Sequence, residues 1–150
     1  MLGADHTWSP ERVANLLGDD YGDNPSDYSL GRDHGLVDFF WQRHGPKQPW
    51  TGTHFSVQAH RLRVGDPELI SPVLRERYGV VPALVPFADV AALLEARGVP
   101  LVEKPYPVAP DEMRTYWQPG SRTLVSVVAG SSYGRAGDVY KVVNPSHGTP

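Results

Sequence analysis

The chain has 150 residues, no cysteine and a formal net charge of −3. This length is typical of a single domain that buries its own core. The absence of cysteine excludes disulfides, thiolate nucleophiles and cysteine-ligated zinc. A pI near 6.0 argues against general nucleic-acid binding, and no apolar run is long enough to cross a membrane. The first residues lack the basic and apolar stretches of a signal peptide, so we expect a cytoplasmic protein.

The first helix is predicted over residues 10–17. Ser9 is a good N-cap residue, Pro10 fits the first helical position, and Gly18 fits the turn that ends a helix. An apolar stripe at i, i+3 and i+4 gives this helix a face that can be buried. The residues after Gly18, up to about Asp33, are rich in Asp, Gly and Asn, which predicts a polar loop.

The remaining elements are predicted to be short. Alternation of apolar and polar residues predicts four strands, the last two forming a hairpin: 36–41, 53–60, 124–129 and 139–143. In the second strand the apolar residues switch from odd-numbered to even-numbered positions near Arg61, as a β-bulge would cause. Residues 101–103 fit an edge strand because prolines follow, and the type of 113–117 stays open. Two further helices are predicted, at 72–79 and 87–97. The expected fold is α+β: an antiparallel sheet with two or three helices on one face.

Two segments that lie 77 residues apart are similar. Val13–Leu17 is VANLL and Val90–Leu94 is VAALL, and each is followed by a glycine and then by predicted strands. The match indicates two tandem helix-then-strand units within the single domain, in residues 1–65 and 80–150. The alternative is a chance match of five common residues.

No arrangement of residues in the sequence is typical of an enzyme or a metal site. His54 and His60 would lie about 20 Å apart on a straight strand, and HExxH spacing is absent, so we expect no metal and no cofactor. A GxSxG motif is also absent. The glycine-rich segment 130–137 leads into a strand rather than a helix, which is typical of a hairpin loop and not of a phosphate-binding loop.

Polar side chains alternate along one face of the predicted strand 53–60. His54, Ser56, Gln58 and His60 share this face, and Asp38 alternates onto the solvent side of the preceding strand. Exposure of Asp38 would disfavour the raised pKa that acid–base catalysis needs. These five residues form an alternative ligand face, for a small enzyme or ligand-binding protein. That alternative predicts a concave pocket and titration near histidine's pKa of about 6.5.

Acidic side chains are concentrated in the first 40 residues. Eight acids and two bases give this segment a charge of −6, so the rest of the chain carries +3. One interpretation is a solvated turn region, because Asp favours turns and caps. The other is a surface that attracts a basic partner. Aromatic residues in the predicted loops, such as Tyr21, Tyr28 and Trp50, are typical of protein contact surfaces, unless they fold back onto the core.

The order of several motifs resembles a known family. A helix begins after Trp8-Ser9-Pro10-Glu11 and ends at Leu17-Gly18, and an acidic loop then leads to the segment 32–41, RDHGLVDFFW. Tyr116-Trp117, the strand 124–128 and GDVY at 137–140 follow later. This order resembles small actinobacterial immunity proteins of polymorphic toxin systems, with His34 in place of the usual aromatic residue and Asp38 in place of the usual Glu. The doubled helix-then-strand order is also similar, more loosely, to β-lactamase-inhibitor proteins, which contain cysteine.

The resemblance implies an immunity protein that neutralises a cognate toxin by blocking its active-site cleft, and it carries over no catalytic residue. We therefore expect a protein-binding function rather than an enzyme, with no nucleic-acid or membrane partner. A self-associating structural subunit is a third hypothesis. The acidic residues would meet a basic cleft of the toxin, and the aromatic residues would anchor the contact. The predicted partner-binding residues are Asp19, Asp20, Tyr21, Asp23, Asp27, Tyr28, Asp33 and Trp50.

Overall fold

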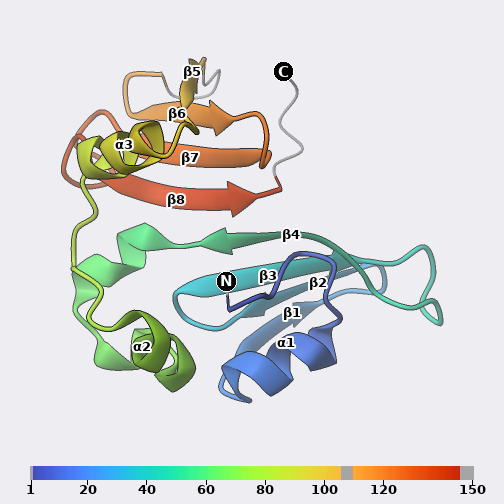
Figure 1. Ribbon diagram of the computed structural model, residues 1–150. Coiled ribbons are helices and arrows are strands. Elements are labelled where there is room, and N and C mark those ends of the chain that lie inside the picture. Colours follow the sequence, from blue (N-terminus) through green and yellow to red (C-terminus); the bar gives the residue numbers. More distant parts are fainter. Residues whose placement is uncertain (1, 106–109, 146–150) are drawn as a thin grey trace.

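The computed structural model describes residues 2–105 and 110–145 (Figure 1). Eight strands form one antiparallel sheet in the order β1-β2-β3-β4-β8-β7-β6-β5. The α+β prediction is therefore confirmed. The strands are β1 (Gly22–Pro25), β2 (Ser29–Asp33), β3 (Val37–Gln42), β4 (Thr51–Val57), β5 (Val102–Lys104), β6 (Met113–Gln118), β7 (Thr123–Val128) and β8 (Val139–Asn144). The helices are α1 (Pro10–Leu17), α2 (Pro72–Tyr78) and α3 (Phe87–Ala96), with two 3₁₀ helices, η1 (Ala59–Val64) and η2 (Pro67–Leu69).

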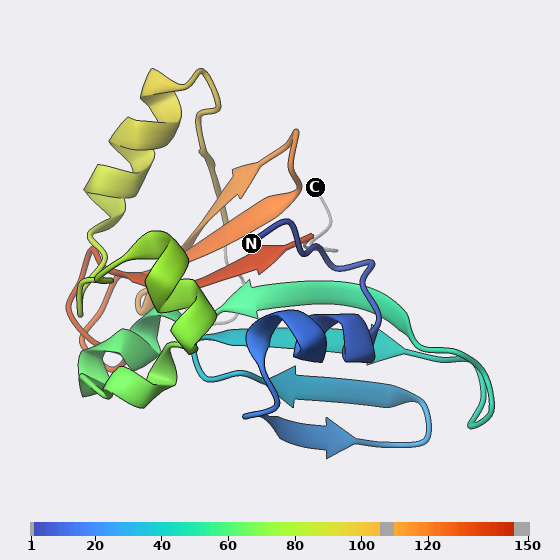
Figure 2. The same cartoon turned by 60° about the horizontal axis from the view of Figure 1, so that its bottom comes forward.

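The three helices cover the same face of the sheet. Val37 pairs with Val57, Val57 with Val142, and Val142 with Val125, so these four side chains point to one face. Residues of α1 and α2 pack on this face beside β3, and residues of α3 pack on it beside β7 and β8. The two views of the ribbon agree with this arrangement (Figures 1 and 2). No helix in the described part of the chain is long and apolar enough to span a bilayer.

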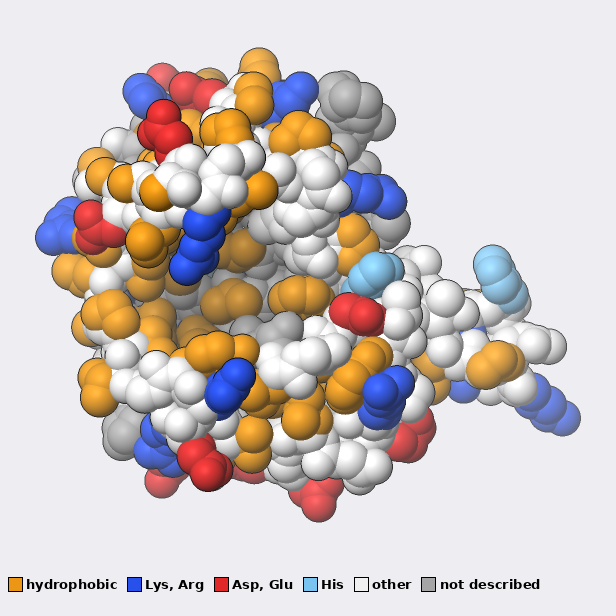
Figure 3. Space-filling view, viewed as in Figure 1, with side chains coloured by type: hydrophobic (Ala, Val, Ile, Leu, Met, Phe, Trp, Pro, Cys, Tyr) orange, Lys and Arg blue, Asp and Glu red, His pale blue; other side chains and the backbone are white. Residues whose placement is uncertain are grey.

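The order of the elements is doubled. In the first half α1 precedes β1–β4, and in the second half α3 precedes β5–β8. Each set of four strands is an antiparallel meander, and the two meanders join where β4 pairs with β8 over three residue pairs. VANLL lies in α1 and VAALL lies in α3. Figure 3 shows a hollow between the two halves, with hydrophobic side chains in its depth.

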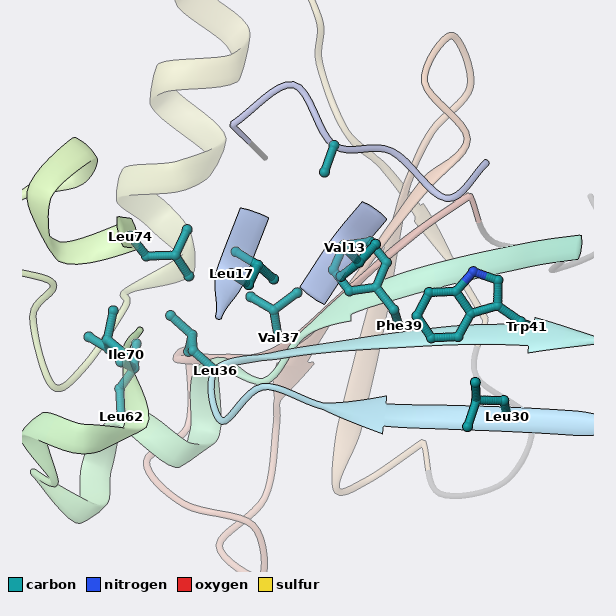
Figure 4. Packing of buried hydrophobic residues seen from close by; sticks show 11 residues of the cluster. Val13, Leu17, Leu30, Leu36, Val37, Phe39, Trp41, Leu62, Ile70 and Leu74 are labelled. Carbon is teal, nitrogen blue, oxygen red and sulfur yellow. The ribbon is translucent and has the colours of Figure 1, made fainter. Parts of the chain in front are cut away.

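The larger core cluster joins the first half to η1 and α2. Val13 and Leu17 of α1 face Val37 and Phe39 of β3 (Figure 4). Ser9 caps α1 as expected, because its Oγ accepts a hydrogen bond from the Arg12 amide at 3.3 Å. The buried Trp41 ring donates from Nε1 to the carbonyl of Trp8 at 2.7 Å, which attaches the segment before α1 to β3.

Two sequence predictions about the first half are wrong. Residues 22–33 form the hairpin β1–β2 rather than a polar loop, because β3 offers an edge with which β2 pairs over five residues. The second predicted strand ends at Val57, and the 3₁₀ helix η1 follows instead of a bulge near Arg61. The switch of the apolar residues from odd-numbered to even-numbered positions thus marks the change from a strand to a helix.

Candidate functional site

An acidic cleft of about 420 Å³ lies where the end of α1 meets the β2–β3 turn and the start of α2. Its walls come from residues 17–22, 33–35 and 68–72. Of the described residues that line it, none is Lys or Arg, and four carry carboxylates: Asp19, Asp20, Asp33 and Glu68. Figure 3 shows acidic side chains along the lower edge of the molecule, below α1 and α2. Such a concentration of one sign of charge favours cationic ligands.

Three of the four carboxylates are free of partners within the part of the chain that the structure describes. Asp19, Asp20 and Glu68 are exposed and make no ion pair or side-chain hydrogen bond there. Asp33 differs, because its Oδ1 accepts hydrogen bonds from the Gly35 amide at 2.7 Å and from Arg61 Nη1 at 2.8 Å. The uncompensated negative charge of the cleft therefore comes mainly from the first three residues.

A buried histidine lies at the cleft. His34 is only 4% exposed, and neither of its ring nitrogens has a hydrogen-bond partner among the residues that the structure describes. Burial lowers the pKa of His34, and the nearby positive charge of Arg32 lowers it further. The imidazole is therefore neutral near pH 7, with one nitrogen that donates and one that accepts. Ser71 also lines the cleft, and its buried hydroxyl has no partner in the described part of the chain.

Local backbone geometry fixes the position of this histidine. Gly35 has φ +79°, and a Cβ there would lie 2.3 Å from the carbonyl oxygen of Leu69. That close approach lets the Leu36 amide donate to the same carbonyl at 2.8 Å, so the β2–β3 turn is held against η2. On the other side the Tyr21 ring lies 5.3 Å from the His34 ring and is covered by the Arg32 guanidinium at 3.8 Å.

The predicted partner-binding residues divide into two groups. Asp19, Asp20, Tyr21 and Asp33 line the acidic cleft. At the other end of the β1–β2 hairpin, Arg43 contacts the remaining three residues. Its Nε donates to the Asp27 carbonyl at 2.7 Å, and its amide donates to the Tyr28 carbonyl at 3.0 Å. Its guanidinium lies 4.1 Å from the centre of the Trp50 ring. Asp23 lies between the groups and is paired with Arg32.

The expectation that Asp38 is exposed is wrong. The residue is 8% exposed, and its carboxylate accepts hydrogen bonds from Gln58 Nε2 at 2.6 Å and from Arg61 Nη1 at 3.1 Å. Gln58 Nε2 also donates to the buried Ser56 Oγ at 2.9 Å. Burial raises the pKa of Asp38, although the charge of Arg61 opposes this. Asp38, Ser56 and Gln58 thus form an internal hydrogen-bond network rather than an open ligand face.

The two histidines of the alternative face lie in different elements. His54 is on β4 and stacks on Phe40, with ring centroids 4.4 Å apart. His60 is in η1, stacks on Tyr140 at 4.2 Å, and has its Nδ1 3.2 Å from the Tyr140 carbonyl. The cavity beside His60 measures about 10 Å³, which is the space of a single water at most. Among the described residues no group of three His, Asp or Glu side chains is placed to hold a metal ion.

Sequence reasoning missed three polar residues that line the cleft: His34, Glu68 and Ser71. No periodicity in the sequence connects residues 68–71 with residues 19–34, because the fold of η2 against the β2–β3 turn brings them together. A signal for His34 did exist, since Gly35 follows it and the segment Leu36–Trp41 is strongly apolar.

Comparison with known proteins gave no match of any kind: no family model, curated protein or solved structure is significantly similar to this chain.

Proposed function

We propose that this chain is an inhibitory protein of the immunity type, which binds a cationic surface of a cognate toxin through its acidic cleft. One observation carries the proposal: among the described residues, four carboxylates and no Lys or Arg line a cleft large enough to receive side chains of a partner. An uncompensated charge of this kind speeds association with a surface of opposite sign and selects against acidic surfaces. The resemblance of the motif order to immunity proteins supports the same function.

The two groups of predicted contact residues support one elongated interface. The edge strand β1 connects them, and all four of its residues are exposed. Tyr21 stands at one end of this edge and Tyr28, which is 59% exposed, at the other. Aromatic side chains at both ends can act as anchors, while the acidic residues orient the partner. A toxin with a basic active-site cleft, as in enzymes that act on anionic substrates, fits this surface, and its occupation would block the substrate.

Growth rescue tests the proposal. The protein encoded beside the gene for this chain is expressed under an inducible promoter, with and without the chain. We expect it to arrest growth by itself, and we expect co-expression of the wild-type chain to restore growth. The variant D19K/D20K should fail to rescue, because it reverses two charges of the cleft without touching the core.

A matched variant separates the cleft from net charge. E95K/D111K changes the total charge by the same amount at exposed positions outside the cleft. It should rescue growth as the wild type does, and the retained toxin should co-purify with it. Failure of the wild-type chain to rescue, or equal rescue by both charge-reversed variants, would overturn the proposed function of the cleft.

A further inference from the structure

We propose that the acidic cleft is a receptor for one arginine side chain of the partner protein, whose guanidinium lies among the carboxylates and donates a hydrogen bond to His34. The inference deepens the proposed function and rests on it for the source of the arginine. The chemistry that is recognised, an alkylguanidinium, follows from the cleft itself.

The charge of the cleft calls for a cation. Asp19, Asp20 and Glu68 offer carboxylates without ion-pair partners in the described chain, and they belong to two separate segments that line the cleft. A cation in the cleft would be attracted by both segments. Because the described residues do not place three ligands for a metal ion, an organic cation is the better match.

The polar groups of the cleft favour a guanidinium over an ammonium. His34 is only 4% exposed, and within residues 2–105 and 110–145 neither its two nitrogens nor the buried Ser71 hydroxyl has a hydrogen-bond partner. A neutral imidazole presents one acceptor nitrogen and a hydroxyl oxygen can also accept. A guanidinium has five N–H donors in a fixed plane, so it can serve acceptors on several sides at once, whereas an ammonium is a compact point charge.

The Tyr21 ring is the side chain to which the proposal assigns a movement. It lies against the His34 ring, and it belongs to the connection between α1 and β1 rather than to a helix or strand. Both His34 nitrogens are buried, so a ligand can reach them only when a neighbouring side chain moves. We assign this movement to Tyr21, whose ring also contacts the Arg32 guanidinium at 3.8 Å.

The test uses the whole chain and a small probe. N-acetyl-arginine methylamide is titrated into the protein while the ring nitrogens of His34 are followed by NMR. We expect a saturable shift of the accepting nitrogen that weakens as salt is added. The matched citrulline compound has the same shape without the charge, and we expect it to cause no saturable shift. n-Butylguanidinium, a free alkylguanidinium with the same single charge, should not bind more tightly than the arginine compound.

Two variants assign the site. D19N/D20N keeps the shape of the cleft, and H34F keeps a ring against Phe39 while it removes both nitrogens. Each should weaken binding about tenfold or more, equivalent to about 1.4 kcal/mol, while E95Q/D111N should bind as the wild type does. If H34F does not fold, the citrulline compound and D19N/D20N still decide the outcome.

The outcomes separate this inference from the proposed function. No saturable shift, or an equal response to citrulline, would overturn the arginine receptor even if growth rescue succeeds. Tighter binding of n-butylguanidinium, by about tenfold, would indicate a site for a free small cation and would overturn the assignment to a partner's side chain. A specific response to the arginine compound together with failed growth rescue would support the arginine receptor and would contradict the proposal that the partner is a toxin.

Discussion

Asp23 and Arg32 form a two-point ion pair, with Arg32 Nε 2.7 Å from Asp23 Oδ1 and Arg32 Nη2 3.0 Å from Asp23 Oδ2. The Arg32 side chain is 9% exposed, and its Nη1 donates to the carbonyl of Pro10 at 2.9 Å. The pair therefore attaches the β1–β2 hairpin to the beginning of α1. Asp23, which the sequence indicated as a contact for a partner, is exposed, but its carboxylate is already paired with Arg32.

Replacement of Asp23 should therefore affect stability more than binding. In Asp23→Asn the nearly buried guanidinium keeps its charge and loses its charged partner, so we expect the free energy of unfolding to fall by about 1–3 kcal/mol. The change is measured by urea unfolding, with the m-value, the dependence of the unfolding free energy on urea concentration, the same in both proteins. Asp27→Asn, at an exposed position in the β1–β2 turn, should change stability by less than about 0.5 kcal/mol. Equal effects of the two substitutions would contradict this account of the ion pair.

The backbone of Gly52 lies against the segment before α1. A Cβ on this residue would be 1.6 Å from the carbonyl oxygen of His6, so Gly52→Ala must displace one of the two chains. We expect a loss of about 1–3 kcal/mol of stability and faster hydrogen exchange in residues 2–9. Gly45→Ala is the control, because there a Cβ would meet only the Gln48 side chain at 3.7 Å. Unchanged exchange in Gly52→Ala would show that the two chains do not touch in solution.

The two similar helices contribute unequally to the core. Leu17 of α1 is 4% exposed, whereas α3 has no fully buried residue and its equivalent residue, Leu94, is only partly buried. Leu17→Ala should cost about 2–4 kcal/mol, and Leu94→Ala no more than about half of that. Chemical unfolding of both variants provides the comparison. A larger loss for Leu94→Ala would mean that the second half carries the stability of the fold.

Stability should decrease below neutral pH because of two histidines, of which His34 is buried and His60 is half-buried. Burial lowers the pKa of both His34 and His60 from the ordinary value of 6.5. The unfolded chain then binds these protons more readily than the folded chain, so protonation favours unfolding. We expect the free energy of unfolding to fall as the pH drops through about 6.5 toward the lower pKa of the folded state.

Substitution identifies the groups responsible. Unfolding measured between about pH 5 and 7.5 should show a shallower decline for His34→Gln and for His60→Gln. His44→Gln, at an exposed position between β3 and β4, is the control and should follow the wild type. An unaltered decline in both His34→Gln and His60→Gln would exclude these histidines as its source.

Local signals in the sequence predicted some elements and missed others for physical reasons. Ser9, Pro10 and Gly18 act within one helix, so they sufficed for α1. Strands with β-branched residues, such as β7 and β8, were also identified. The hairpin β1–β2 was missed because Gly22–Pro25 contains no residue that favours strands, and pairing with a neighbouring strand decides its conformation instead.

The candidate site was predicted in part. The density of acidic residues indicated Asp19, Asp20 and Asp33, because they lie close together in the sequence. Glu68 joins them only through tertiary structure, which no spacing in the sequence reports. The alternation that placed Asp38 on the solvent side of its strand was correct about its face. The further prediction that Asp38 is exposed was wrong, because Gln58 and Arg61, which lie outside the strand, hydrogen-bond to its carboxylate.

The junction between β4 and β8 also bears on how fast the chain can fold. Within β1–β4 and within β5–β8, each strand pairs with its neighbour in sequence, so those hairpins close short loops. The pairing of Val57 with Val142 closes a far longer loop for only three residue pairs, and closing a long loop is entropically costly before its contacts form. The two meanders should therefore acquire structure early and independently, and their union should form the late, rate-limiting part of folding.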